Sequence, residues 1–329
     1  MKVKGIGKLQ FFEDKDECPQ MPGDDPAWQD SFVLNLWDID NNVYAFLRVS
    51  QVPNKGEGIA TAWLNIWVPG FMYKNTQVEL PLMAGDRTAS SLSVGEGLCR
   101  YSYDDAHLWT VNDPQAEVYA QLTLRDSHPG MCFYPNADDH FVTQTTSNHI
   151  EASGQVTGTV RVKGQEYVVQ GAGWRDHSWG KRNWGGIRAH RFFAANFGEQ
   201  LRIACLSYIG DDGHWTKNGV IIKNNEIQFT DQFSITAYMG EDAIGNRGGR
   251  LEMIIDGEPC TLSFEPVGKG AVSLIDTFPC VNSMCRVRMA DQLGVGMAET
   301  SNNPLSGVEK PFVFAASAAV LDNGLFPVT

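Results

Sequence analysis

The segment 171–186, GAGWRDHSWGKRNWGG, places three tryptophans, three cations, one aspartic acid and one histidine between glycines. Tryptophans around Asp176 would exclude water, which disfavours the carboxylate, raises the pKa and leaves a proton donor at neutral pH. The cations Arg175, Lys181 and Arg182 act in the opposite direction and lower that pKa. The residues alone therefore leave two interpretations equally open, an acid catalyst or an ion pair within a tryptophan-rich core.

Asp176 and His177 follow Gly171 and Gly173, which we interpret as the end of a strand. The motif is therefore predicted at a strand end, near the mouth of a barrel. The tryptophans fall five residues apart, a spacing that fits neither one helix face nor one strand face.

A second acidic residue, Glu299, occurs in the late segment LGVGMAETS. Val295, Met297 and Glu299 share one face of the expected strand, so the acid points into a barrel if that face is inward. If the face is outward, Glu299 is an ordinary surface residue.

His149 and Glu151 are two residues apart and share a strand face. With Asp176 or His177 they could form a histidine–carboxylate metal site. Isolated histidines are more often structural or surface residues, and we predict no metal.

Other common chemistries have no support in the sequence. It contains no GxSxG, HExxH or GxxxxGK[ST] motif, and its GVG lies within an expected strand rather than before a helix. We therefore predict no cofactor.

The composition limits the partners. The net charge is −13, and the basic residues are scattered, which argues against nucleic acid and anionic membranes. No window approaches 18 consecutive apolar residues, so we expect no membrane span. The N-terminus lacks the pattern of a secretory signal, and seven cysteines without a CxxC spacing indicate reduced thiols. We expect a cytoplasmic protein that binds a hydrophobic small molecule.

Short alternating segments separated by turn residues predict an all-β fold with few short helices. Candidate hairpin turns are IDNN, Lys163-Gly164, Asn224-Asn225 and Asp256-Gly257, and a late strand is expected at 311–321. A polar stretch around 127–149 separates two strand-rich halves. We predict two tandem antiparallel β-barrels, residues 1–150 and 151–329.

Two motifs resemble a known family. Asp176 with Trp179 after a glycine-rich segment, and Gly294-x-Gly296-x-x-Glu299 with Thr300 and Ser301, are similar to the lipocalin-like two-barrel proteins that include carotenoid 1,2-hydratase and kievitone hydratase. The opening Trp28-Gln29-Asp30-Ser31 fits a branch of that family. His177-Ser178 departs from the carotenoid enzymes, so the substrate does not transfer.

The resemblance implies acid chemistry without a cofactor on isoprenoid-like molecules: protonation of an alkene or alcohol, then addition or loss of water. On this basis Asp176 is the expected general acid, His177 its orienting partner or base, and Glu299 a second proton-transfer group. Aromatic faces stabilise a carbocation. The expected substrate-binding residues are Trp28, Trp179, Arg182 and Trp184.

Two other functions fit the same residues. The barrels could carry a hydrophobic molecule without catalysis, with the Asp176 segment as a seal. Relatives also suggest a cyclase or Diels–Alder catalyst, in which the acids matter less.

Overall fold

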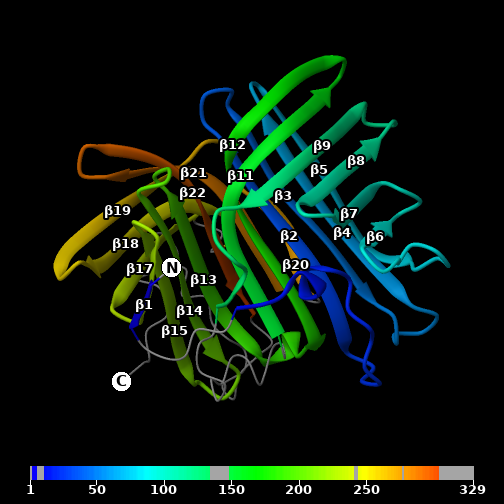
Figure 1. The fold of residues 1–329 in the computed structure, drawn as a ribbon, viewed down its shortest axis with the longest axis horizontal. Coiled ribbons are helices and arrows are strands. Elements are labelled where there is room, and N and C mark those ends of the chain that lie inside the picture. The colour runs from blue at the N-terminus through cyan, green and yellow to red at the C-terminus, as the bar shows by residue number, and fades with distance from the viewer. Residues whose placement is uncertain (1, 6–10, 134–147, 241–243, 276–277, 304–329) are drawn as a thin grey trace. The chain divides into compact units, whose positions relative to one another are not determined.

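The structure is a computed structural model that describes residues 2–5, 11–133, 148–240, 244–275 and 278–303 (Figure 1). The chain divides into two compact units. The first unit comprises Gln10–Cys132 and Thr146–Arg182, and the second comprises Met1–Leu9, Phe133–Thr145 and Asn183–Thr329. Each unit is built around one large sheet. The expected strand at 311–321 lies outside the described residues.

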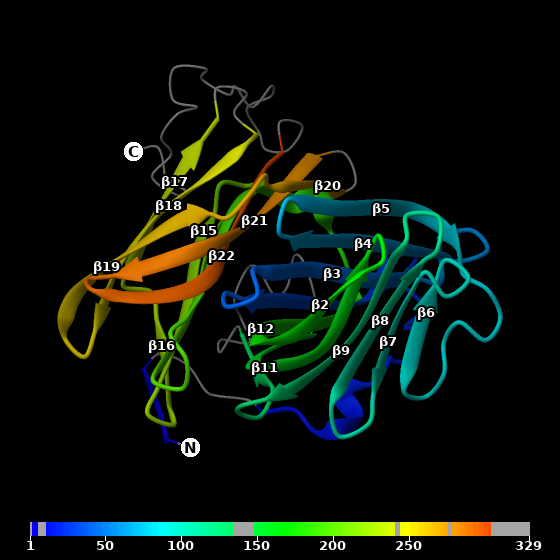
Figure 2. The same cartoon turned by 90° about the horizontal axis from the view of Figure 1, so that it is seen from above.

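The sheet of the first unit has the order β5-β4-β3-β2-β12-β11-β9-β8-β7-β6, with β10 paired to β11 and all pairs antiparallel. Figure 2 shows how this sheet curves from β5 to β6. Its elements are η1 (Asp14–Glu17), β2 (Trp28–Asp38), β3 (Val43–Val52), β4 (Ile59–Val68), β5 (Phe71–Pro81), β6 (Ser91–Val94), β7 (Cys99–Tyr103), β8 (His107–Asp113), β9 (Val118–Asp126), β10 (Met131–Cys132), β11 (Asn148–Val162) and β12 (Gln165–Lys181).

The sheet of the second unit has the order β1-β16-β15-β14-β13-β22-β21-β19-β18-β17, with β20 paired to β21. All its pairs are antiparallel except β1 with β16. Its elements are β1 (Lys2–Gly5), η2 (Trp184–Gly186), β13 (Ile187–Asn196), β14 (Leu201–Gly210), β15 (Trp215–Lys223), β16 (Glu226–Thr230), β17 (Phe233–Met239), β18 (Asn246–Ile255), β19 (Glu258–Pro266), β20 (Ala271–Ile275), β21 (Phe278–Met289) and β22 (Gln292–Asn302).

The predicted all-β class is confirmed, since the two 3-10 turns η1 and η2 are the helical elements of the described chain. The predicted turns are also confirmed. Asn42, Lys163, Asn224, Asn225 and Asp256 all have positive φ values, between 49° and 60°. Asparagine, aspartate and glycine tolerate this conformation best, which is why these short sequences join neighbouring strands.

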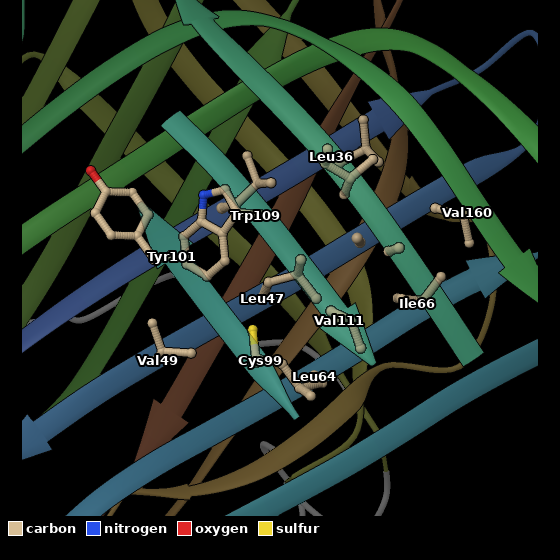
Figure 3. Packing of buried hydrophobic residues seen from close by; sticks show 14 of the residues in the cluster. Leu36, Leu47, Val49, Leu64, Ile66, Cys99, Tyr101, Trp109, Val111 and Val160 are labelled. Carbon is tan, nitrogen blue, oxygen red and sulfur yellow. The ribbon is translucent and has the colours of Figure 1, made fainter. Parts of the chain in front are cut away.

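The apolar core of the first unit lies on one face of its sheet, here called the inner face. Side chains from β2, β3, β4, β7, β8 and β11 meet there, among them Leu36, Leu47, Trp109 and Val160 (Figure 3). Strands β3 and β4 contact β6 and β7 across this core, so the sheet is strongly curved. Because side chains alternate along a strand, every second residue points to the opposite face.

The units differ from the predicted ranges 1–150 and 151–329. The hairpin of β11 and β12 pairs with β9 on one side and β2 on the other, which places residues 148–181 in the first unit. The polar stretch before the hairpin suggested a boundary. Pairing between strands far apart in sequence decides the unit, and local pattern does not report it.

The predicted strand end at Gly171 and Gly173 is wrong, because β12 continues to Lys181. These glycines are needed within the strand. A Cβ atom at Gly171 would lie 2.6 Å from the backbone oxygen of Trp37, and one at Gly173 would lie 2.6 Å from Val156. The sequence signal for a turn is here a signal for close packing.

All seven cysteines are thiols, as predicted. Among the described residues, no helix combines the length and apolar character needed to cross a bilayer.

Close strand packing in the second unit predicts a stability defect. A Cβ at Gly296 on β22 would lie 2.0 Å from the backbone oxygen of Ala194 on β13. We expect Gly296→Ala to lower the free energy of unfolding by about 1–3 kcal/mol, since overpacking forces backbone shifts. Urea unfolding measures the change. Gly185→Ala is the control, because its Cβ would meet no atom nearer than 3.7 Å; equal effects of both substitutions would contradict the interpretation.

Candidate acid–base site

Alternation along β12 divides the motif between two faces of the sheet. Asp176 and Ser178 lie on the face opposite the apolar core, here called the outer face. His177 and Trp179 lie on the inner face. The predicted pairing of Asp176 with His177 is therefore not formed.

Three titratable side chains meet on the outer face. The register of β11 with β12 puts Glu151 directly opposite Asp176, and His149 lies two residues before Glu151 on the same face. His149 Nε2 is 3.1 Å from Glu151 Oε1 and 3.1 Å from Asp176 Oδ2. The Trp174 indole N–H donates to the other oxygen of Glu151. We call His149, Glu151 and Asp176 the β11–β12 triad.

The members of the triad differ in exposure and pKa. Only 4% of the Glu151 side chain is exposed, compared with 23% of the Asp176 side chain. Burial raises the pKa of Glu151 to about 7, despite the opposing effect of His149. Burial also acts to raise the pKa of Asp176, but the charge and hydrogen bond of His149, with Arg182 and Ser178, leave that pKa lowered.

His149 completes the arrangement as a cation. Burial acts to lower its pKa, yet Asp176 and then Glu151 raise it to about 9. At neutral pH an imidazolium therefore lies between an ionised Asp176 and a partly protonated Glu151. Asp176, the expected general acid, has its pKa lowered by its partners, whereas burial raises the pKa of Glu151, so Glu151 is the carboxyl group better suited to donate a proton.

Polar groups extend the triad along β12 and β2. Ser178 Oγ donates to Asp176 Oδ1 at 3.1 Å, and the Arg182 guanidinium donates to Ser178 Oγ. Ser31 Oγ lies 3.1 Å from Ser178 Oγ and 3.3 Å from the same guanidinium nitrogen. Arg182, expected to contact substrate, thus lies on the Asp176 side and stabilises its negative charge.

His177 belongs to a different network on the inner face. Its Nε2 is 2.8 Å from Asp30 Oδ1, and its ring stacks on Phe32 at a centroid distance of 4.1 Å. Trp179 packs against the same imidazole, with centroids 4.6 Å apart. Trp28 shares the face of Asp30 on β2. The structure therefore places the buried His177 and Trp28 and the half-buried Trp179 on the face of the sheet opposite Asp176.

The other two predicted residues belong to the second unit. Trp184 begins η2 and is half-buried. Glu299 lies on β22, where its Oε1 is 2.7 Å from His190 Nε2. The face of Glu299 is opposite the apolar core formed by Phe193, Ala298 and their neighbours.

Sequence reasoning noted the spacing of His149 and Glu151 but did not assign a role to either. The missing information was the register, since only the pairing of β11 with β12 shows that Glu151 faces Asp176. Trp174 and Ser178 were also missed as partners. The two-residue period through Trp174, Asp176 and Ser178 was a usable signal once the segment was read as a strand.

The sequence matches, over residues 13–304, the model of a family described as a domain of unknown function, DUF7064. The chain belongs to the DUF7064 family. No curated protein matches the sequence.

Three solved structures share the fold of this DUF7064 protein. Kievitone hydratase from Nectria haematococca has 10% identity and a TM-score of 0.61, covering 92% of this chain and 96% of its own. CghA, solved with Sch210972, has 11% identity and a TM-score of 0.58, covering 89% and 97%. A candidate AttH protein from Nitrosomonas europaea has 12% identity and a TM-score of 0.66, covering 83% and 92%. These similarities confirm the predicted resemblance to the lipocalin-like two-barrel proteins at the level of the fold.

The inner-face network predicts that His177 acts in stability. His177→Ala leaves Asp30, which is fully buried, without its imidazole partner. We expect a loss of about 1–3 kcal/mol in the free energy of unfolding, the usual cost of leaving a buried acceptor without one of its partners, since Asp30 Oδ2 still accepts from the Gln20 N–H and the Gln51 amide. Denaturant unfolding measures it, with the exposed His214→Ala as control. A loss below that of the control would show that the pair is not structural.

The raised pKa of Glu151 predicts a pH-dependent stability. Its pKa rises from 4.5 in the unfolded chain to about 7 in the folded protein. The protonated form therefore favours folding, and this contribution is lost as pH rises through about 7. Relative to Glu151→Gln, which cannot ionise, the native protein should lose stability between about pH 5 and 8. If the difference in free energy of unfolding between the native protein and Glu151→Gln does not change across that range, the raised pKa is contradicted.

Proposed function

We propose that this DUF7064 protein is an enzyme that adds water to, or removes it from, a hydrophobic small molecule by acid–base catalysis. The β11–β12 triad is the observation that carries the proposal. It combines a carboxyl group with a pKa of about 7 and a carboxylate, each 3.1 Å from the same imidazolium nitrogen. The fold shared with kievitone hydratase supports the same class of reaction.

The triad suits both halves of a hydration. Glu151 donates its proton to an alkene carbon, and the carbocation formed lies beside the Asp176 carboxylate, which stabilises positive charge. Water then forms the new carbon–oxygen bond and gives its extra proton to Asp176. His149 restores the starting protonation states, because its Nε2 lies close to both acids. It passes its proton to Glu151 and takes the proton that Asp176 has received. The reverse sequence, starting with protonation of a hydroxyl group, removes water.

Exposure favours Asp176 as the group next to the reacting water. Its side chain is 23% exposed, whereas His149 is 11% and Glu151 4% exposed. Burial of the Glu151 side chain protects its proton from exchange with bulk water until a substrate displaces that water, while the more exposed Asp176 stays accessible. We propose a terpenoid or other isoprenoid alkene or alcohol as substrate, the class that the family resemblance implies.

The other residues predicted for the site differ in whether the proposed reaction uses them. Arg182 supports Asp176 through Ser178 and is retained in the site as a positioning residue. The proton-transfer role predicted for Glu299 stays a prediction. His177, Trp28 and Trp179 are not part of the proposed chemistry.

Substitution of the two acids tests the proposal. We expect Glu151→Gln and Asp176→Asn each to reduce turnover about 10²–10⁴-fold, the usual contribution of a positioned proton-transfer group. In the native protein the rate should fall as pH rises through about 7, since Glu151 must be protonated, and this alkaline limb should be absent from any residual activity of Glu151→Gln. The matched control is Glu166→Gln, at an exposed position on β12, the strand that carries Asp176.

The assay follows solvent deuterium into candidate isoprenoid alkenes and alcohols by mass spectrometry. Full turnover in folded Glu151→Gln and Asp176→Asn, with product formed by ring closure, would favour the cyclase alternative. Binding without turnover or deuterium exchange would favour the carrier. Either result would contradict the proposed hydratase.

A further inference from the structure

A cluster of side chains of types that bind metal ions lies wholly within the second unit. His190 on β13, Glu299 on β22 and Cys280 on β21 come from three adjacent strands. The register places both His190 and Cys280 opposite Ser301, two residues from Glu299, so all three share the face opposite the apolar core. One ligand atom from each of His190, Cys280 and Glu299 lies within 4.8 Å of the other two. The proposed hydratase does not use this cluster.

Both His190 and Glu299 also make hydrogen bonds to residues outside the cluster. His190 presents Nε2 to Glu299 Oε1 at 2.7 Å, while its Nδ1 is 2.5 Å from Ser301 Oγ. The Asn282 amide donates to the second oxygen of Glu299. Supporting bonds of this kind fix the tautomer and ring orientation of a metal-binding histidine and the rotamer of a carboxylate.

The side chains also match one metal. A thiolate, an imidazole and a carboxylate together suit Zn²⁺, with bonds near 2.3 Å to sulfur and 2.0–2.2 Å to nitrogen and oxygen. Tetrahedral bonds of that length put ligand atoms about 3.3–3.8 Å apart. The observed separations, 2.7 Å between His190 and Glu299 and at most 4.8 Å across the cluster, bracket this range. Shifts of about 1 Å or less would close the site.

We propose that His190, Cys280 and Glu299 bind one Zn²⁺ ion, with a fourth position left for water or another ligand. Binding would displace the thiol proton of Cys280 and any proton on His190 Nε2, so that protons are released as the metal enters. Nδ1–H of His190 would then donate to Ser301 Oγ. This site is independent of the β11–β12 triad, which has no sulfur ligand.

The difference in ligand atoms between the two clusters makes the test specific. The full-length protein is titrated with Zn²⁺, and then with Co²⁺ as a spectroscopic substitute. We expect one Zn²⁺ per chain, proton release, and a near-ultraviolet thiolate-to-cobalt charge-transfer band. Cys280→Ser should remove the band, whereas Cys260→Ser, a half-buried cysteine on β19 of the same unit, should leave it unchanged. Ser301→Ala should lower zinc affinity about 10–100-fold through loss of the supporting bond.

Three outcomes would overturn the proposal. The first is no stoichiometric Zn²⁺ binding by the native protein. The second is a cobalt complex without a thiolate band, or with a band that Cys280→Ser retains. The third is zinc binding abolished by His149→Ala and unaffected by His190→Ala, which would assign the metal to the β11–β12 triad. Urea unfolding confirms that each variant is folded; if Cys280→Ser is not, unchanged affinity in Ser301→Ala and His190→Ala overturns the proposal in its place.

Discussion

The antiparallel register between β11 and β12 is the constraint on which the β11–β12 triad depends. It places Glu151 directly opposite Asp176, at a separation where two ionised carboxylates repel each other strongly. His149, on the same face, reduces the repulsion by contacting both acids. A slip of one residue would turn one strand's acid toward the apolar core. The burial of Val156 and Val160 on the inner face therefore also fixes the positions of the two acids on the outer face.

The same alternation of side chains lets β12 place a charged group on each face of the sheet. Arg175, the residue before Asp176, points inward and binds the carboxylates of Asp126 and Glu17, at distances of 2.5–3.1 Å. Burial disfavours its charge, but these carboxylates hold its pKa above the usual value. The inward Arg175 is paired with these two carboxylates, and the pairing stabilises the fold. The two outward acids share His149 as a partner, and Asp176 keeps an exposed fraction of 23%.

Much of the fold could be predicted from the sequence because turn chemistry is local. Lys163-Gly164 and Asp256-Gly257 report their hairpins through backbone conformations that few residues tolerate. The placement of Asp176 could not be predicted in the same way. Gly171 and Gly173 resemble a strand end, yet they permit close contacts within a long strand. The pattern singled out the segment around Asp176 but paired Asp176 with its sequence neighbour His177, whereas adjacent residues on a strand point to opposite faces of the sheet.

The insertion of β12 beside β2 has a consequence for the way the first unit forms. Ser31 and Ser178 meet across 147 residues of chain. Until the β11–β12 hairpin arrives, β2 and β9 are open edges whose backbone groups lack their partners. Pairing over such a distance is slow, because loop closure must precede the contacts that reward it. During synthesis these two edges are open to pairing with the wrong strands, and the hairpin that brings the acids together is also the piece that covers both edges.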